Sequence, residues 1–173
     1  MKHPLCAAAC VAAVLAVLDL TPALADSQRD FLREAIRGDN SEIMLGRIGE
    51  RRAATPAVRS FAETLVADHR QARAEALRLA ARLHMRPARG AQQEAMKERE
   101  RLHGFAGWGF DAEFARYMVQ DHRQDIAKFR HEADAGHGAA SALARHQLPT
   151  LRKHLAMALQ LNERFARYTQ REP

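Results

Sequence analysis

The chain has 173 residues, a length that suits one domain with a sizeable core. Its formal net charge of +6 could indicate nucleic-acid binding, but the arginines are spread along the chain without a basic run or interleaved aromatic residues. We therefore exclude a nucleic-acid-binding protein and expect a solvated basic surface, for which anionic envelope surfaces are the natural partner.

The N-terminal residues are typical of a secretory signal peptide. Lys2 precedes an apolar run over residues 5–18, and Ala23-Leu24-Ala25 forms a small-residue cleavage site before Asp26. The run is shorter than the roughly 20 residues that a membrane-spanning helix needs. We therefore predict that residues 1–25 are removed after Ala25 and that residues 26–173 form one periplasmic or secreted domain without a transmembrane segment.

Both cysteines of the chain, Cys6 and Cys10, lie within this signal. Lipidation of Cys10 is disfavoured, because most of the apolar region follows this residue instead of preceding it. The mature chain is therefore expected to carry out no disulfide or thiolate chemistry.

Two helices are predicted in the first half of the mature chain. Residues 26–52 carry apolar side chains at helical spacing, although Gly38-Asp39-Asn40 weakens the middle of this helix. Thr55 is suited to cap the next helix, and Pro56 is suited to its first position. That helix is predicted to run from Pro56 to about Leu83.

Two more long helices are predicted in the second half. Residues 91–103 suggest a short helix within a long connection, and Asp111 is suited to cap a helix that continues to about Ala135. The last helix is predicted over residues 139–168. The sequence therefore predicts an all-α fold, an antiparallel four-helix bundle with a long connection between its second and third helices. A helical repeat protein is the alternative, but two copies of a unit are too few to stack into one.

One stretch of the second helix recurs in the third. FAETLVADHRQ at residues 61–71 matches FARYMVQDHRQ at residues 114–124, with seven identical residues in register. His69 and His122 occupy equivalent positions, and each falls among the apolar residues of its helix. The repeat therefore indicates a duplicated helical unit with one inward imidazole in each copy.

Helix geometry brings four inward polar residues to a similar height. Measured from the first turn near Ala54, Glu42 and His69 differ in height by about 4 to 5 Å. Measured from the second turn, His122 and His154 differ by roughly 3 Å. We therefore predict that these four side chains meet at mid-height in the core of the bundle.

One carboxylate and three imidazoles suit a single divalent transition metal ion such as copper, zinc or iron. Asp125, one helical turn after His122, is a further candidate ligand. Asp68 and Asp121 are rotated by about 100° from the histidines, and they are candidates for orienting the imidazole rings. The alternative is that the histidines are buried polar groups bonded to carboxylates or carbonyls without a metal. The remaining histidines are predicted to lie on the surface: His84, His103, His131, His137 and His146.

Short motifs along the whole mature chain carry a resemblance to a known family. They are Asp30-Phe31-Leu32 with Ala35, Asn40-Ser41-Glu42-Ile43 with Leu45-Gly46, Val58 with Phe61-Ala62, Val66 with Asp68-His69, Phe110-Asp111, Tyr117-Met118-Val119 with Asp121-His122, and Leu148-Pro149 with Leu151 and His154-Leu155. In this pattern the chain resembles the ferritin-like proteins grouped as domain-of-unknown-function family 4142, often labelled predicted outer membrane protein. The resemblance implies a ferritin-like four-helix bundle in an exported bacterial protein, and it strengthens the choice of Glu42, His69, His122 and His154.

The chain departs from the di-iron proteins of similar fold, which use two Glu-x-x-His motifs and two further glutamates. Neither inward histidine pair here belongs to such a motif, and the few inward carboxylates disfavour a di-iron enzyme. We therefore expect a binding protein for metal handling or envelope stress tolerance. A metal-free envelope interaction or structural module is the first alternative, and a metal-dependent oxidoreductase is the second.

Overall fold

The computed structural model describes residues 21–136 and 138–169, with the side chains of residues 26–136 and 138–167. In this part of the chain there are five α-helices and no strand: α1 (Thr21–Arg52), α2 (Pro56–Arg82), α3 (Gln93–His103), α4 (Gly107–Asp134) and α5 (Ala139–Thr169). The predicted all-α class is confirmed, and the helix count is five because the long connection contains α3. Helix α1 begins five residues before its predicted start at Asp26, while most of the predicted signal peptide, like His137, lies outside the described residues.

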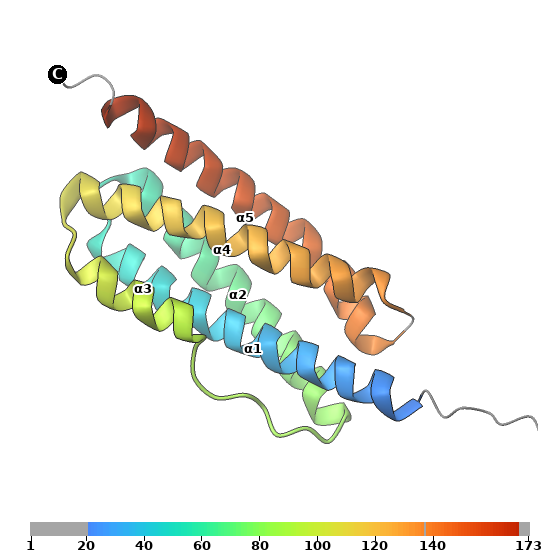
Figure 1. Ribbon diagram of the computed structural model, residues 1–173. Coiled ribbons are helices and arrows are strands. Elements are labelled where there is room, and N and C mark those ends of the chain that lie inside the picture. Colours follow the sequence, from blue (N-terminus) through green and yellow to red (C-terminus); the bar gives the residue numbers. More distant parts are fainter. Residues whose placement is uncertain (1–20, 137, 170–173) are drawn as a thin grey trace, which may run out of the picture.

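The four long helices lie side by side, and α3 packs against α1 and α4 (Figure 1). Contacts are most extensive between α1 and α2 and between α4 and α5, and each of these pairs is joined by a short turn. The molecule therefore consists of two antiparallel helix pairs packed on each other. Over the described residues, none of these helices combines the length and the apolar character that crossing a membrane requires.

A polar layer divides the core of the four long helices. Toward one end of the bundle lies an apolar cluster with Leu45, Phe61 and Phe114, and toward the other end lie clusters with Leu32 and Phe129. Burying each such side chain stabilises the fold by roughly 1.5 to 3 kcal/mol. Between these clusters along the helices come the buried polar residues Asp39, Glu42, His69, Asp121, His122, Asp125 and His154.

The turn between α1 and α2 is held by a side chain of α4. Thr55 caps α2 as predicted, accepting a hydrogen bond from the amide of Val58, and Pro56 opens the helix. Asp111 does not cap α4, which begins at Gly107, so that prediction is wrong. Instead the fully buried Asp111 carboxylate accepts hydrogen bonds from the Ala54 amide at 2.9 Å and from the Thr55 amide and hydroxyl at 2.8 and 2.7 Å. These amides of the turn have no helical acceptor, so the carboxylate satisfies them.

Candidate metal centre

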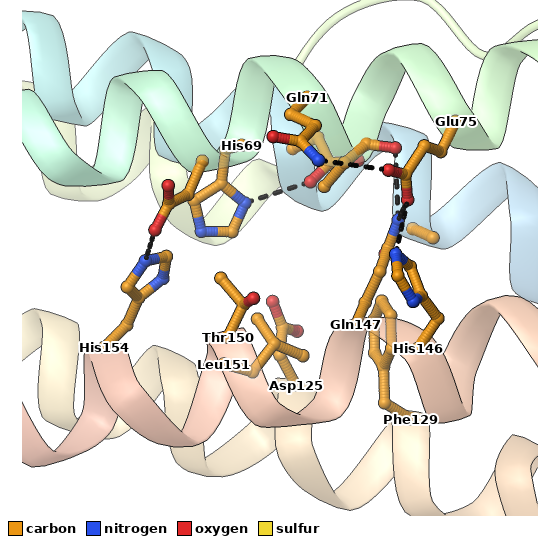
Figure 2. Close-up of a pocket in the computed structure, with 14 residues that line it drawn as sticks. His69, Gln71, Glu75, Asp125, Phe129, His146, Gln147, Thr150, Leu151 and His154 are labelled. Atoms are coloured by element: carbon orange, nitrogen blue, oxygen red, sulfur yellow. Dashed lines mark hydrogen bonds and ion pairs between the residues drawn. The ribbon is translucent and has the colours of Figure 1, made fainter.

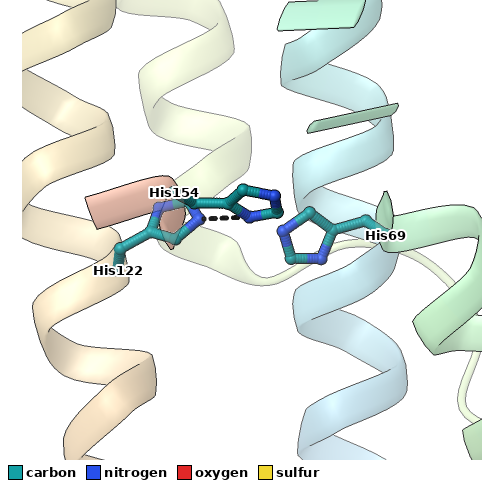
Figure 3. Close-up of side chains that lie close together, drawn as sticks. All are labelled: His69, His122 and His154. Atoms are coloured by element: carbon teal, nitrogen blue, oxygen red, sulfur yellow. Dashed lines mark hydrogen bonds between the residues drawn. The ribbon is translucent and has the colours of Figure 1, made fainter. Parts of the chain in front are cut away.

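Three histidines from three different helices meet in the polar layer. His69 on α2, His122 on α4 and His154 on α5 are only 4%, 1% and 0% exposed. Their ring centroids lie 5.2 to 5.9 Å apart, and one ring nitrogen of each lies within 4.8 Å of those of the other two (Figure 3). The structure therefore brings together three of the four residues predicted to form the site.

In each imidazole, the ring nitrogen that faces away from the other two histidines, here called the outer nitrogen, makes a hydrogen bond. The nitrogen that faces the other two histidines is called the inner nitrogen. His69 Nδ1 lies 2.9 Å from Asp39 Oδ1, and His154 Nε2 lies 2.8 Å from Asp68 Oδ2. His122 Nδ1 lies 3.0 Å from the carbonyl oxygen of Met118, one turn earlier on the same helix. A carbonyl or an ionised carboxylate can only accept, so these contacts place a hydrogen on each outer nitrogen.

The inner nitrogens are then left with lone pairs. His122 Nε2 and His154 Nδ1 are 3.3 Å apart, and neither carries a hydrogen when both rings are neutral. His69 Nε2 is buried and has no hydrogen-bond partner. Three lone pairs in this arrangement repel one another unless a hydrogen-bond donor or a cation lies between them. Such an orientation of imidazoles by carboxylates and a carbonyl is typical of histidine metal ligands.

Burial disfavours protonation of two of these imidazoles, His122 and His154. It lowers the pKa of His154 to about 4, with a further contribution from the neighbouring His69, and it lowers the pKa of His122 well below its ordinary value. A proton on His122 or His154 is therefore unfavourable at neutral pH. A metal ion requires neutral imidazoles, and burial favours that form for these two rings.

Glu42 lies in a second group that shares His122 with the first. One ligand atom from each of Glu42, Asp121 and His122 falls within 4.8 Å of the others. Glu42 is 1% exposed, and neither of its carboxylate oxygens has a hydrogen-bond partner. Burial first, and then repulsion from Asp121, raise the pKa of Glu42 well above its ordinary value. The structure thus places Glu42 beside His122, and the group of three histidines does not include it.

The candidate ring-orienting residue Asp68 and the candidate ligand Asp125 have different partners. Asp68 is bonded to His154 as described and to Lys153 at 3.1 Å, so it orients a ring of another helix. Asp125 is 7% exposed, accepts a hydrogen bond from Lys128 at 3.3 Å and has a pKa raised to about 7, mainly by burial. Neither ligand group of the described residues includes Asp125.

Asp39 is the member of this layer that the sequence analysis missed. The stretch Gly38-Asp39-Asn40 predicts only a weakened helix, yet Asp39 is 6% exposed and bonded to His69. With Asp39, Glu42, Asp121 and Asp125, the layer holds four buried carboxylates. The expectation of few inward carboxylates is therefore wrong.

A cavity that His69 and His154 line opens between α2 and α5 (Figure 2). It has a volume of about 80 Å³, and Asp39 lines it together with these two histidines. The exposed His146 also lines it, 3.7 Å from Glu75 in an ion-pair geometry. His84, His103 and His131 are exposed as predicted, away from this layer.

Comparisons with known proteins match the chain to a family and to a fold. A family model described as "Domain of unknown function (DUF4142)" matches residues 17–161. Among solved structures, the chain is similar to the crystal structure of a DUF305 fragment from Deinococcus radiodurans, with a TM-score of 0.71 and 17% sequence identity, over 79% of this chain and 95% of that chain. At that identity the similarity concerns the fold alone. None of the curated proteins compared with the chain matches it.

Proposed function

The chain belongs to the DUF4142 family, and we propose that its helical bundle binds one divalent transition metal ion through His69, His122 and His154. The observation that carries this proposal is the convergence of one ring nitrogen from each of three buried histidines, all within 4.8 Å of one another. Asp39, Asp68 and the Met118 carbonyl fix the rings from outside. The protein would then bind a metal ion in the bundle core and contribute to metal handling or to envelope stress tolerance.

The donor set narrows the class of metal. Neutral imidazoles suit zinc, copper and iron, whereas magnesium and calcium prefer oxygen ligands. No cysteine lies in the part of the chain that the structure describes, so thiolate ligands do not contribute there. Three protein ligands leave a coordination position for water or a small ligand from the cavity, an arrangement common in exchangeable and catalytic sites.

The ferritin-like fold and the export of the protein are also part of the proposal. The packing of α1, α2, α4 and α5, with α3 in the long connection, supports a ferritin-like four-helix bundle. Export after cleavage at Ala25 stays a prediction based on the N-terminal sequence alone. In the envelope, such a site would meet metal ions that enter the cell from outside.

Metal titration of histidine variants tests the ligand assignment. Purified metal-free protein is titrated with Zn²⁺ and, separately, with Cu²⁺ by calorimetry, and elemental analysis gives the stoichiometry. We expect one ion per chain, and we expect His69→Ala, His122→Ala and His154→Ala each to lower the affinity by at least about tenfold, or ~1.4 kcal/mol, because each removes a ligand. His131→Ala, an exposed histidine of α4, is the matched control and should bind like the wild type.

Two results would count against this assignment. Stoichiometric binding that survives the combined His69→Ala and His122→Ala substitutions would place the ion elsewhere. Absence of any binding to the folded wild-type protein would favour the metal-free interpretation, in which the buried histidines serve the structure of the bundle.

A further inference from the structure

A buried carboxylate in the polar layer has no partner that accounts for it. Glu42 is 1% exposed, and both of its oxygens lack a hydrogen bond. Burying an ionised group without a partner costs several kcal/mol, so such groups are normally paired or bind a cation. Glu42 therefore needs either a proton, as its raised pKa indicates, or a bound cation that displaces the proton.

The neighbour of Glu42 is a second acid. Asp121 is 8% exposed, and one of its oxygens lies 3.3 Å from the Tyr117 hydroxyl, which donates to it. No lysine or arginine among the described residues forms an ion pair with Glu42 or Asp121, since Lys128 pairs with Asp125 and Lys153 with Asp68. Two adjacent carboxylates thus share one small volume without a protein cation.

The third member of this group, His122, cannot serve two ions at once. Its Nδ1 is bonded to the Met118 carbonyl, and the single lone pair on Nε2 faces His154. The imidazole set therefore uses His122, and the oxygens of Glu42 and Asp121 remain for a different ion. Oxygen-only ligands suit hard divalent cations such as Mn²⁺ and Mg²⁺.

From these contacts we infer that Glu42 and Asp121 bind a second divalent cation, of the hard, oxygen-preferring class, beside the three-histidine site. The two charges of the cation match the two carboxylates. Asp121 and Tyr117 also line a surface groove with residues of α1, α3 and the connection before α3. This groove is distinct from the cavity at His69 and His154, so Asp121 gives the second cation a separate route from solvent. The second ion rests on the proposed function, since it would lie beside the first. Its carboxylate ligands can nevertheless be substituted without removing an imidazole ligand of the first ion.

Manganese binding to zinc-loaded protein tests the second position. Metal-free protein is first loaded with one equivalent of Zn²⁺ and is then titrated with MnCl₂. The electron paramagnetic resonance signal of free Mn²⁺ measures the fraction of Mn²⁺ that is bound. We expect saturable binding of one Mn²⁺ per chain in the wild type, and loss of that binding in Glu42→Gln with zinc still bound. Glu63→Gln, which changes an exposed glutamate of α2, is the matched control and should bind Mn²⁺ normally.

The two sites are told apart in the same samples. In His69→Ala, Mn²⁺ binding should persist while the zinc stoichiometry falls. Thermal unfolding establishes that Glu42→Gln is folded, and Asp121→Asn replaces it if it is not. Absence of saturable Mn²⁺ binding in the wild type, or unchanged binding in the carboxylate variant, overturns the second site even if zinc binds. Carboxylate-dependent Mn²⁺ binding without histidine-dependent zinc binding would instead overturn the proposed function.

Discussion

Two carboxylates decide how the imidazoles of His69 and His154 are presented. Asp39 and Asp68 each accept the hydrogen of an outer ring nitrogen, which fixes both the orientation of the ring and the nitrogen that faces inward. The His154 pair joins α5 to α2, and the His69 pair joins α2 to α1. A metal ion would therefore meet ligands whose geometry is set before it arrives.

Removing one of these supports should weaken metal binding without removing a ligand. For Asp39→Ala we expect Zn²⁺ affinity about 10- to 100-fold below that of the wild type, with one ion still bound per chain, because His69 loses its orientation and basicity. Competition with a chelating indicator measures the affinity. Asp30→Ala, an exposed aspartate of the same helix, is the control. An unchanged affinity in Asp39→Ala would mean that His69 is not a ligand.

The positions of residues along the bundle axis explain why the contact between His122 and His154 was predicted well and the partner of His69 was not. His122 and His154 were placed at nearly equal height, and their ring nitrogens are 3.3 Å apart. On α1 the same calculation leaves Glu42 about 4 to 5 Å from the height of His69, which corresponds to three residues. The residue three positions earlier is Asp39, the observed partner of His69. The signal was present, but the stretch was interpreted only by helix propensity.

At the scale of helices, two glycines let α1 approach α2 closely. A Cβ added at Gly49 would lie 2.7 Å from the Ala62 Cβ and 2.9 Å from the Phe114 Cζ. A Cβ at Gly46 would lie 2.7 Å from a Val66 methyl group. Glycine is unfavourable in a helix by roughly 1 kcal/mol relative to alanine, so its presence here reflects the contact between helices.

Gly49→Ala should therefore destabilise the protein although it improves helix propensity. The expected loss is about 1 to 3 kcal/mol in the free energy of unfolding, because the neighbouring side chains must move apart. Urea denaturation followed by circular dichroism measures it. Gly109→Ala in α4, where the added Cβ would lie at an ordinary 3.6 Å from its nearest neighbour, should be neutral or stabilising. Equal effects of the two substitutions would contradict a close contact at Gly49.

Asp111 shows the limit of local rules at the same scale. Its residue type and its place before an apolar run predict a helix cap, but its carboxylate serves the α1–α2 turn, which is 56 residues away in the chain at Thr55. Hydrogen-bond donors of that turn are not satisfied locally, and only the packed fold brings an acceptor to them. Such a long-range partner has no signature in the sequence near Asp111.

At the scale of the whole molecule, the proposed ion joins the two helix pairs. His69 belongs to the α1–α2 pair, whereas His122 and His154 belong to the α4–α5 pair. Direct contacts between the pairs are less extensive than those within them. An ion held by all three imidazoles would therefore be lost when the pairs separate, which couples metal binding to global unfolding.

Because of this coupling, zinc should raise the melting temperature, and the increase should require both helix pairs. A free Zn²⁺ concentration of 100 times the dissociation constant adds about 2.7 kcal/mol of stability, or roughly 5 to 10 °C for a protein of this size. Calorimetric scans with and without zinc measure the increase, and a chelator should reverse it. His131→Ala should show the full effect and His69→Ala almost none. An undiminished increase in His69→Ala would place the ion within the α4–α5 pair alone, where it could not join the two halves of the bundle.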